Sequence, residues 1–322
     1  MNDFLDHFSP HLRKIDDVLN QSLGTRIPVV LDIVRYSLLG AGKKIRPLLF
    51  VLSSHLCGYQ GGDVYRLSTV FEYVHAASLL HDDVLDNADL RRSKPSVRQV
   101  WGNSAAVLGG DFLYAAASAV AVECRNLELI RLLSDVLKRM VEGQFLELEH
   151  THNWKITKAE YMEIITAKTA ALMGAACSSG AVVAGADEKT VQHLGEFGSN
   201  LGIAFQLMDD LLDYTSSEEV FGKPVGKDLK EGKITLPLVY FVSELERGEV
   251  ERAAELFKSQ KASDQDYEEI IGRVRGHEAI ERVRSEASEY VARAGELLRL
   301  FPASEFKQGL LELGAYILTR RH

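Results

Sequence analysis

The stretch Leu79–Pro95, LLHDDVLDNADLRRSKP, is the part of the chain around which the rest can be interpreted. It places Asp82, Asp83 and Asp86 close together at the end of an apolar segment. On a helix, residues four apart share one face, so Asp82 and Asp86 point the same way. Carboxylates stacked in this manner repel one another unless a cation lies between them. Mg²⁺ typically binds one or two carboxylates together with substrate phosphates, so the spacing indicates a metal site.

Two arginines, Arg91 and Arg92, follow these acids in a loop closed by Lys94 and Pro95. Guanidinium groups bind phosphate oxygens in a fork geometry. Acids that can hold a metal beside bases that can hold a phosphate therefore indicate a diphosphate site. For this stretch alone, the alternative is a frayed and solvated helix end that carries scattered charges.

A second acid cluster occurs in the stretch FQLMDDLLDY, which begins at Phe205. Asp209, Asp210 and Asp213 repeat the spacing of the first cluster, again at the end of an apolar helical segment. One cluster of the form DDxxD is weak evidence, but two in one acidic chain favour metal-assisted diphosphate chemistry over two frayed helix ends.

Composition limits the class of protein. The 322 residues carry a formal charge of −9 and 46% are hydrophobic, which is typical of a globular protein and argues against nucleic-acid binding. The cysteines lack CxxC spacing and the first residues lack a signal peptide, so we expect a reducing, cytoplasmic location. The longest uncharged run, Thr169–Ala186, is rich in Ala, Gly and Ser. We interpret it as a close-packed interior helix and expect no transmembrane segment.

Nearly every segment has a helical period, so the sequence predicts an all-α protein without strands and, since no linker is found, a single domain over residues 1–322. Leu127–Glu149 is expected to be one helix. Thr157 followed by Glu160 predicts a capping box at the start of another. Pro47 is expected as the first residue of its helix.

The loop Gly42–Pro47, GKKIRP, places cations beside a helix start. Helix N-termini offer unpaired N–H groups and a positive dipole end. With Lys43 and Arg46, this loop is a candidate anion site that needs no metal, although a solvated basic loop is the alternative. His75 lies seven residues before Asp82 on the same face and could reach a bound phosphate, unless its role is structural.

Lys168 lies in an Ala-rich helix, where its charge requires an anionic partner. Gln206 precedes Asp209 by three residues and lies on nearly the same face. Glu147, at a helix end near two histidines, could resemble a metal ligand, but we expect it to be solvated. The polar stretch Thr215–Gly232 is predicted to be a mobile lid.

Two lysines in and beside this lid, Lys223 and Lys233, each follow a glycine, which allows the backbone to approach a ligand closely. They are therefore favoured as ligand contacts over the neighbouring surface lysines.

These motifs together resemble the trans-type polyprenyl (isoprenyl) diphosphate synthases, in particular medium- and long-chain members of the octaprenyl type. The resemblance covers about Leu39 to Pro237 in order: AGKKIRP, the first aspartate-rich motif, WGNSAAVLGGDFLYA, AKTA, the second aspartate-rich motif, and GKPVGKDLKEGKITLP. Ala41 and Lys44 depart from the family, which commonly has Gly and Arg there.

The resemblance implies a role for each matched residue. The diphosphate of isopentenyl diphosphate would be held by Lys43, Arg46, His75 and Arg92. Several Mg²⁺ ions bridging the allylic diphosphate would be held by Asp82, Asp83, Asp86, Asp209, Asp210 and Asp213. The same allylic group would be clamped by Arg91, Lys168, Lys223 and Lys233. The forming carbocation would be faced by Thr169 and Gln206.

The implied fold is one large antiparallel helical bundle, the isoprenoid synthase fold, with the two acid helices facing a central cavity, usually as a homodimer. The implied enzyme is a prenyltransferase that ionises an allylic diphosphate, such as farnesyl diphosphate, condenses it with isopentenyl diphosphate and eliminates a proton. Ala77 and Ser78 are small and lie one turn behind Asp82, where short-chain members carry bulky aromatics. We therefore expect a medium- to long-chain all-trans product of the kind found in quinone side chains, unless these residues are small only because a neighbouring helix packs there.

Three alternatives stay open. A short-chain farnesyl or geranylgeranyl diphosphate synthase would use the same motifs. A terpene cyclase or head-to-head synthase would share the ionisation but would not need the Gly42–Pro47 loop. A non-catalytic partner subunit should have lost acids, whereas all six are present.

Overall fold

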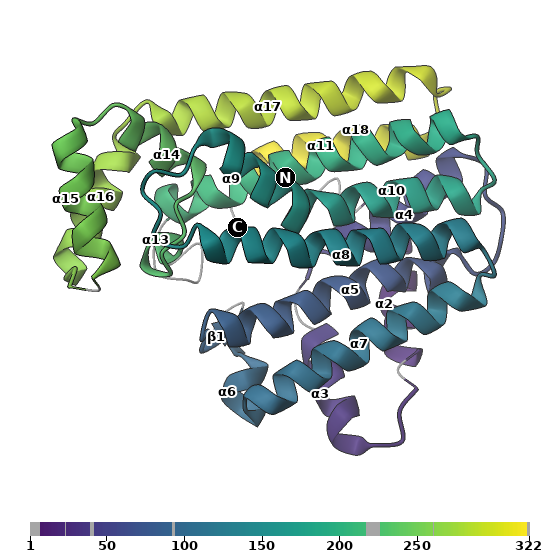
Figure 1. Cartoon of the computed structure of the whole chain (residues 1–322). Coiled ribbons are helices and arrows are strands. Elements are labelled where there is room, and N and C mark those ends of the chain that lie inside the picture. Colours follow the sequence, from purple (N-terminus) through teal and green to yellow (C-terminus); the bar gives the residue numbers. More distant parts are fainter. Residues whose placement is uncertain are drawn as a thin grey trace. The chain divides into compact units, whose positions relative to one another are not determined.

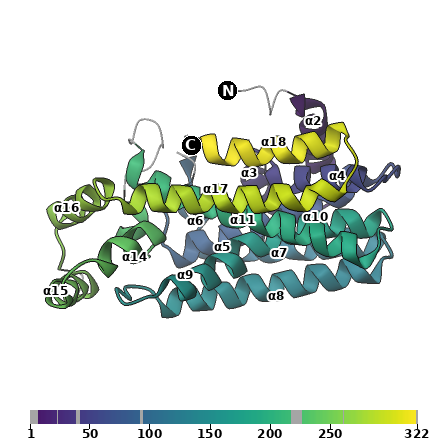
Figure 2. The same cartoon turned by 90° about the horizontal axis from the view of Figure 1, so that it is seen from above.

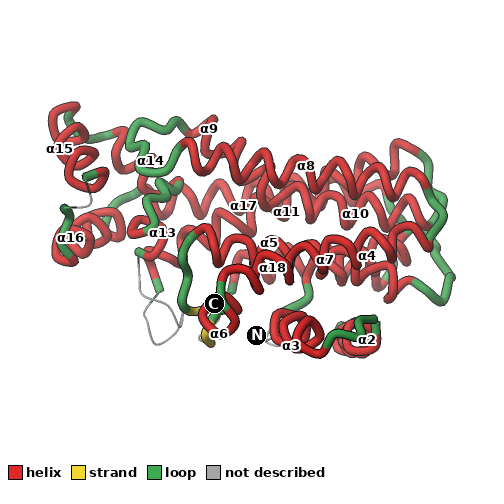
Figure 3. The backbone as a smooth tube through the Cα atoms, turned by 60° about the horizontal axis from the view of Figure 1, so that its bottom comes forward, coloured by secondary structure: helices red, strands yellow, loops and turns green. Residues whose placement is uncertain are grey.

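The structure is a computed structural model that describes residues 7–22, 24–38, 42–91, 94–216, 226–259 and 261–320. Regular structure within these ranges is almost entirely helical (Figure 3), which confirms the all-α prediction. The exception is a pair of two-residue antiparallel strands, β1 (Leu90–Arg91) and β2 (Lys94–Pro95), beside α6. The expectation of no strand is wrong at this point because two residues are too few to give an alternating pattern.

The chain divides into two compact units. The first comprises Met1–Leu137, Leu172–Ser199 and Gly295–Leu313, and the second comprises Lys138–Ala171, Asn200–Ala294 and Gly314–His322. A single domain over the whole chain stays a prediction.

Helices follow one another along the described parts of the chain (Figure 1). From the N-terminus to the first acid cluster they are α2 (Ser9–Gln21), α3 (Pro28–Leu38), α4 (Ile45–Leu56) and α5 (Val64–Leu85). They continue with α6 (Val97–Trp101), α7 (Asn103–Glu123), α8 (Leu127–Glu149), α9 (Lys158–Ile165), the π-helical turn η1 (Thr166–Ala170), α10 (Ala171–Val183) and α11 (Glu188–Thr215). The last are α13 (Lys227–Lys230), α14 (Leu236–Ser243), α15 (Arg247–Lys258), α16 (Asp264–Arg275), α17 (Ala279–Leu297), the 3₁₀ turn η2 (Leu298–Leu300) and α18 (Glu305–Thr319).

In the first unit, α5 lies alongside α7 and α4 packs against α5 (Figure 1). The rings of Phe50 and Phe71, 5.4 Å apart, join α4 to α5 in the core. The helix α4 begins at Ile45, so the expectation that Pro47 is its first residue is wrong by two positions. Pro47 occupies the third helical position, where its missing N–H costs nothing because that group has no partner within the helix.

The predicted interior helix is confirmed as α10, in which every residue from Ala171 to Ala181 is buried. In the second unit, α14, α15 and α16 form a group (Figure 2). Phe257 on α15 packs against Trp154 at 5.1 Å and against Tyr267 at 4.9 Å. The capping box at Thr157 is also confirmed, since its side chain and that of Glu160 bond each other's backbone N–H.

Among the described residues, α7 is the one helix long and apolar enough to cross a membrane by length and composition alone. Helices in the core of globular proteins pass the same test. The packing of α7 along α5 accounts for its buried apolar side chains, which are 39% of its apolar 18-residue window, whereas Leu108 and Val122 stay exposed.

Candidate active site

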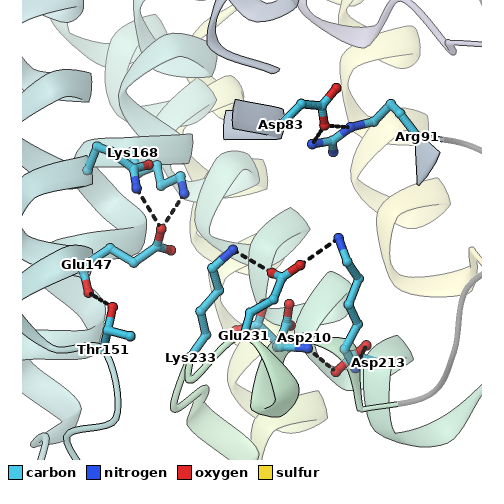
Figure 4. A network of polar contacts seen from close by, with 12 residues as sticks. Asp83, Arg91, Glu147, Thr151, Lys168, Asp210, Asp213, Glu231 and Lys233 are labelled. Atoms are coloured by element: carbon cyan, nitrogen blue, oxygen red, sulfur yellow. Dashed lines mark hydrogen bonds and ion pairs between the residues drawn. The ribbon is translucent and has the colours of Figure 1, made fainter. Parts of the chain in front are cut away.

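The first acid cluster forms the end of α5. Asp86 caps the helix and its N–H donates to the carbonyl of Asp82 at 2.8 Å. Asp82 and Asp86 are half-buried, whereas Asp83 is only 3% exposed. Arg91 donates from Nε at 2.8 Å and from Nη2 at 2.5 Å to the same oxygen, Oδ1 of Asp83 (Figure 4). The structure therefore pairs the buried acid of this cluster with Arg91.

The predicted anion loop precedes α4 in the first unit. Lys43 and Arg46 are partly exposed, and the residues between them, Lys44 and Ile45, are buried. His75 is half-buried on α5 and its carbonyl accepts a hydrogen bond from the hydroxyl of Ser78 at 2.8 Å. Arg92, the fourth residue expected at this site, lies outside the described residues.

The chain-length candidates lie on α5. Ala77 is fully buried and lies one turn before His81, whose ring packs 5.6 Å from that of Tyr114 on α7. Ala77 is therefore on the face of α5 that meets α7. Ser78 is half-buried. The packing explanation for Ala77 thus stays open beside the chain-length one.

In the second acid cluster, at the end of α11, Asp210 is 2% exposed and both of its oxygens accept hydrogen bonds. Tyr161 donates to Oδ2 at 2.5 Å and Gln206 donates from Nε2 to Oδ1 at 2.8 Å. Burial raises the pKa of Asp210 well above its ordinary value, and the charge of Asp228 raises it further. Burial likewise raises the pKa of Tyr161, so its phenol keeps the proton that it donates.

Asp213, the last acid of this cluster, is 4% exposed and receives backbone donors. Its Oδ1 accepts the N–H of Lys227 and its Oδ2 accepts the N–H of Asp228, each at 3.1 Å. Its carbonyl accepts the N–H of Gly226 at 2.9 Å. Asp213 therefore caps α13, a short helix within the predicted lid Thr215–Gly232.

Asp209 is the accessible acid of the second cluster, with 42% of its side chain exposed. Its partner is Arg320, near the C-terminus, whose Nη2 donates to Oδ1 of Asp209 and, at 3.1 Å, to the carbonyl of Phe205. The guanidinium also lies 3.9 Å from the centroid of the Phe205 ring. The sequence gives no signal of this contact, because 111 positions separate the two residues.

Lys168 and Thr169 lie in η1, and π-helical turns inside α-helices occur frequently at functional sites. Lys168 donates to Glu147 at 2.5 Å (Figure 4), so the expectation that Glu147 is solvated is wrong. Its position near two histidines concealed the pairing, because the partner lies on another helix. Thr169 donates to Oε1 of Gln206 at 2.9 Å, which brings two predicted carbocation contacts together.

Two glycines allow helices to approach η1 closely. A Cβ on Gly143 of α8 would lie 2.7 Å from the backbone nitrogen of Lys168, and one on Gly202 of α11 would lie 2.5 Å from Cα of Ala170. Glu147 and Gln206 each follow one of these glycines by four residues and so share its face. A glycine one turn before a polar residue was therefore a signal in the sequence for both pairs.

The lysines after α11 are held by Glu231. Lys227 and Lys233 each donate to it at 2.8 Å, on different oxygens (Figure 4). Lys223 and residues 217–225 of the predicted lid lie outside the described residues. Three of the cations that the resemblance assigns to the allylic diphosphate are thus each paired with a carboxylate: Arg91, Lys168 and Lys233.

Residues 27–274 match the family model described as polyprenyl synthetase. The chain belongs to this family. Its polyprenyl synthetase relatives include octaprenyl diphosphate synthase of Haemophilus influenzae, 33% identical over 97% of this chain and 94% of the relative. A nonaprenyl diphosphate synthase of Rhodobacter capsulatus described as geranyl-diphosphate specific is 32% identical, covering 99% and 97%. A short chain isoprenyl diphosphate synthase of Methanothermobacter thermautotrophicus is also 32% identical, covering 100% of both chains.

A solved structure has the same fold along the whole chain. Polyprenyl synthase from Caulobacter crescentus, complexed with calcium and isoprenyl diphosphate, is 32% identical and covers 100% of this chain and 98% of its own, with a TM-score of 0.95. The predicted isoprenoid synthase fold and the assignment as a prenyltransferase are thereby confirmed.

The residues of this polyprenyl synthetase fit a hard divalent cation that a substrate helps to bind. Among the described residues, no three His, Cys, Asp or Glu side chains gather into a metal site. Mg²⁺ does not need such a cage, because it typically takes one or two carboxylates and completes its shell with substrate phosphates and water. Asp82, Asp86 and Asp209 offer at least partly exposed carboxylates of this kind.

Proposed function

We propose that the protein condenses isopentenyl diphosphate with an allylic diphosphate, such as farnesyl diphosphate, to give a medium- to long-chain all-trans polyprenyl diphosphate. The observation that carries this proposal is that the acids at the ends of α5 and α11 have two different environments. Each acid cluster keeps an accessible carboxylate, and each also uses a buried carboxylate to hold a side chain in place, Arg91 in the first and Tyr161 in the second.

The six acids divide into two groups in this proposal. Asp82, Asp86 and Asp209 would hold Mg²⁺ ions at the allylic diphosphate. The others, Asp83, Asp210 and Asp213, hold Arg91, Tyr161 with Gln206, and the start of α13, respectively. Bound Mg²⁺ supplies positive charge that makes diphosphate a good leaving group.

The basic residues act on the same leaving group. Arg91, Lys168 and Lys233 would donate to the charge that develops on diphosphate as the allylic C–O bond breaks. Their carboxylate partners hold them before substrate binds, so little rearrangement is needed at that step. Lys168 and Glu147 are each about one fifth exposed, which leaves the ammonium accessible to a ligand.

The partner substrate needs a separate place. Lys43, Arg46 and His75 would hold isopentenyl diphosphate without a metal, so that its alkene meets the carbocation before water does. Thr169 and Gln206, joined by a hydrogen bond, would face that cation with oxygen atoms. The motifs contain no obvious side-chain base, so the released diphosphate would take the final proton.

If the two diphosphates bind at separate sites, two substitutions should each affect a different substrate. Arg46→Ala should mainly raise the KM for isopentenyl diphosphate, and Arg91→Ala should mainly raise the KM for the allylic substrate. Steady-state kinetics with each substrate varied in turn measures both constants. Identical shifts in the two variants would count against two separate diphosphate sites.

Product length rests on Ala77 and Ser78, which are too small to close a hydrocarbon tunnel behind Asp82. A short-chain product is the second candidate, and the short-chain relative of equal identity favours keeping it. The expected cytoplasmic location stays a prediction.

A homodimer is supported by the surface of α7. Leu108 is 66% exposed and Val122 is 58% exposed. They are two heptads apart and share one face with Ala115, which is also exposed. A second copy of the chain would cover this apolar face, and sedimentation velocity of the wild type and of Leu108→Glu tests that assembly.

A further inference from the structure

Lys44 lies in the Gly42–Pro47 loop, between Lys43 and Arg46 of the candidate anion site. The side chain is buried, with 4% exposed, and the backbone is in the left-handed region at φ 49°. Such a conformation is costly for a residue with a side chain and persists only where surrounding contacts hold it. Lys44 therefore turns inward while its neighbours Lys43 and Arg46 stay partly exposed.

Lys44 joins three helices of the first unit, two through its ammonium group and one through its backbone carbonyl. Nζ donates to the carbonyl of Leu38, the last residue of α3, at 2.6 Å. It also donates to Oε1 of Glu72 on α5 at 3.0 Å, and Glu72 is itself 7% exposed on its side chain. The carbonyl of Lys44 accepts the N–H of Leu48 in the first turn of α4. A cation at a helix C-terminus is favourable, so the Leu38 contact adds to the ion pair.

The ion pair lies next to the proposed isopentenyl diphosphate residues on both sides. Lys44 lies between Lys43 and Arg46, and Glu72 precedes His75 by three residues on the same helix. The pair thus fixes the loop that carries two of the three described anion-binding residues to the helix that carries the third.

We propose that Lys44 is a positioning residue for the metal-free diphosphate subsite, acting through its buried contact with Glu72 to set where Lys43 and Arg46 point. This inference rests on the proposed function, since the subsite is assigned there. A buried ion pair is weak evidence for stability, because well-packed apolar residues often replace one without loss. The ion pair instead explains how the backbone of this loop is held, and so where the side chains of Lys43 and Arg46 point.

The experiment separates positioning from stability with a double substitution. Burial raises the carboxyl pKa of Asp16, the charge of Lys44 lowers it and that of Glu72 raises it. Lys44→Met removes the favourable charge and leaves the Glu72 carboxylate buried, so this variant is expected to melt at a lower temperature. Lys44→Met/Glu72→Met removes both charges and is expected to regain most of the lost melting temperature. Lys44→Arg keeps the charge and is the rescue variant.

Two readouts are needed. The first is the KM for isopentenyl diphosphate and for the allylic substrate. The second is isothermal titration of isopentenyl diphosphate and of inorganic diphosphate in EDTA, which requires neither metal nor turnover. We expect the KM of the double variant for isopentenyl diphosphate to rise about 10- to 100-fold, because small displacements of binding groups have effects of this size. The KM for the allylic substrate should change less than about twofold. Lys14→Met, which removes an exposed lysine 5.0 Å from the Tyr65 ring, controls for loss of one charge.

The outcomes distinguish failure of the positioning role of Lys44 from failure of the proposed function. If the double variant regains both its melting temperature and its wild-type affinity, Lys44 is structural only and the inference is overturned. Equal shifts in both KM values would overturn it too. If the wild type condenses no prenyl chain but inorganic diphosphate still binds in a Lys44-dependent way, the proposed function fails while the positioning role stands.

Discussion

Asp213→Asn tests how the second acid cluster is used. In the wild type, both carboxylate oxygens of Asp213 accept backbone N–H groups, from Lys227 and Asp228. An asparagine of the same shape keeps one acceptor and presents an NH₂ group to the other donor. Loss of one cap costs about 1 kcal/mol, and an unsatisfied buried donor costs about 1–3 kcal/mol.

Hydrogen exchange reports this loss where it occurs. A local destabilisation of about 1–3 kcal/mol should accelerate exchange of the Lys227 and Asp228 amides roughly 5- to 150-fold, since 1.4 kcal/mol is tenfold. Asp209→Asn is the matched control, because its 42% exposed side chain contacts Arg320 and does not touch these amides. Exchange should therefore stay near the wild-type rate in that variant.

The result would separate a cap from a metal ligand. If Asp213→Asn leaves exchange of these amides unchanged and instead raises the Mg²⁺ requirement as Asp209→Asn does, Asp213 is a ligand and the reasoning from its hydrogen bonds is refuted.

Three other predictions follow from the structure. Ala77→Phe should shorten the product while Ala77→Ser keeps it; a folded and active Ala77→Phe enzyme that still makes the wild-type length would place the chain-length limit elsewhere. Gly143→Ala should lower stability by about 1–3 kcal/mol in denaturant titrations because its Cβ would meet η1, whereas Gly272→Ala, with open space around it, should raise stability by about 0.5–1 kcal/mol. Burial, with lesser effects from the charges of His55 and Lys14, lowers the pKa of His11 below 6.5, so the unfolded chain binds the proton more readily. The neutral His11 ring therefore contributes its full share of stability above pH 6.5, and that share is lost as the pH drops below this value. The melting temperature should fall less with acidification in His11→Gln than in the wild type, and equal dependence of the melting temperature on pH in both proteins would contradict this.

Much of the fold was predictable because it depends on local patterns. The period of three and four residues predicted helices, and the residue pair Thr157 and Glu160 predicted a helix start that the structure confirms. Leu127–Glu149 was predicted with its observed bounds. The start of α4 was missed because the helix begins directly after Lys44, whose positive φ cannot be predicted from a lysine in the sequence.

The candidate site was predictable in its residue types but, apart from the signal that Gly143 and Gly202 give for η1, not in its pairings. The spacing of the acids showed which could share a face, yet nothing local distinguishes Asp209 from the buried Asp210. The partners that make the difference, Tyr161 and Arg320, come from distant parts of the chain. Contacts of this kind depend on tertiary packing, which a single sequence does not reveal.

Metal-dependent chain elongation is the central claim, and one measurement tests it directly. The wild type would be incubated with labelled isopentenyl diphosphate and farnesyl diphosphate, with Mg²⁺ or with EDTA, and the labelled products separated by length, beside Asp82→Ala and Asp209→Ala. The proposed function predicts all-trans chains of medium to long length in Mg²⁺, none in EDTA, and loss of nearly all turnover in both variants. Elongation in EDTA, or near-wild-type turnover in either variant, would contradict it.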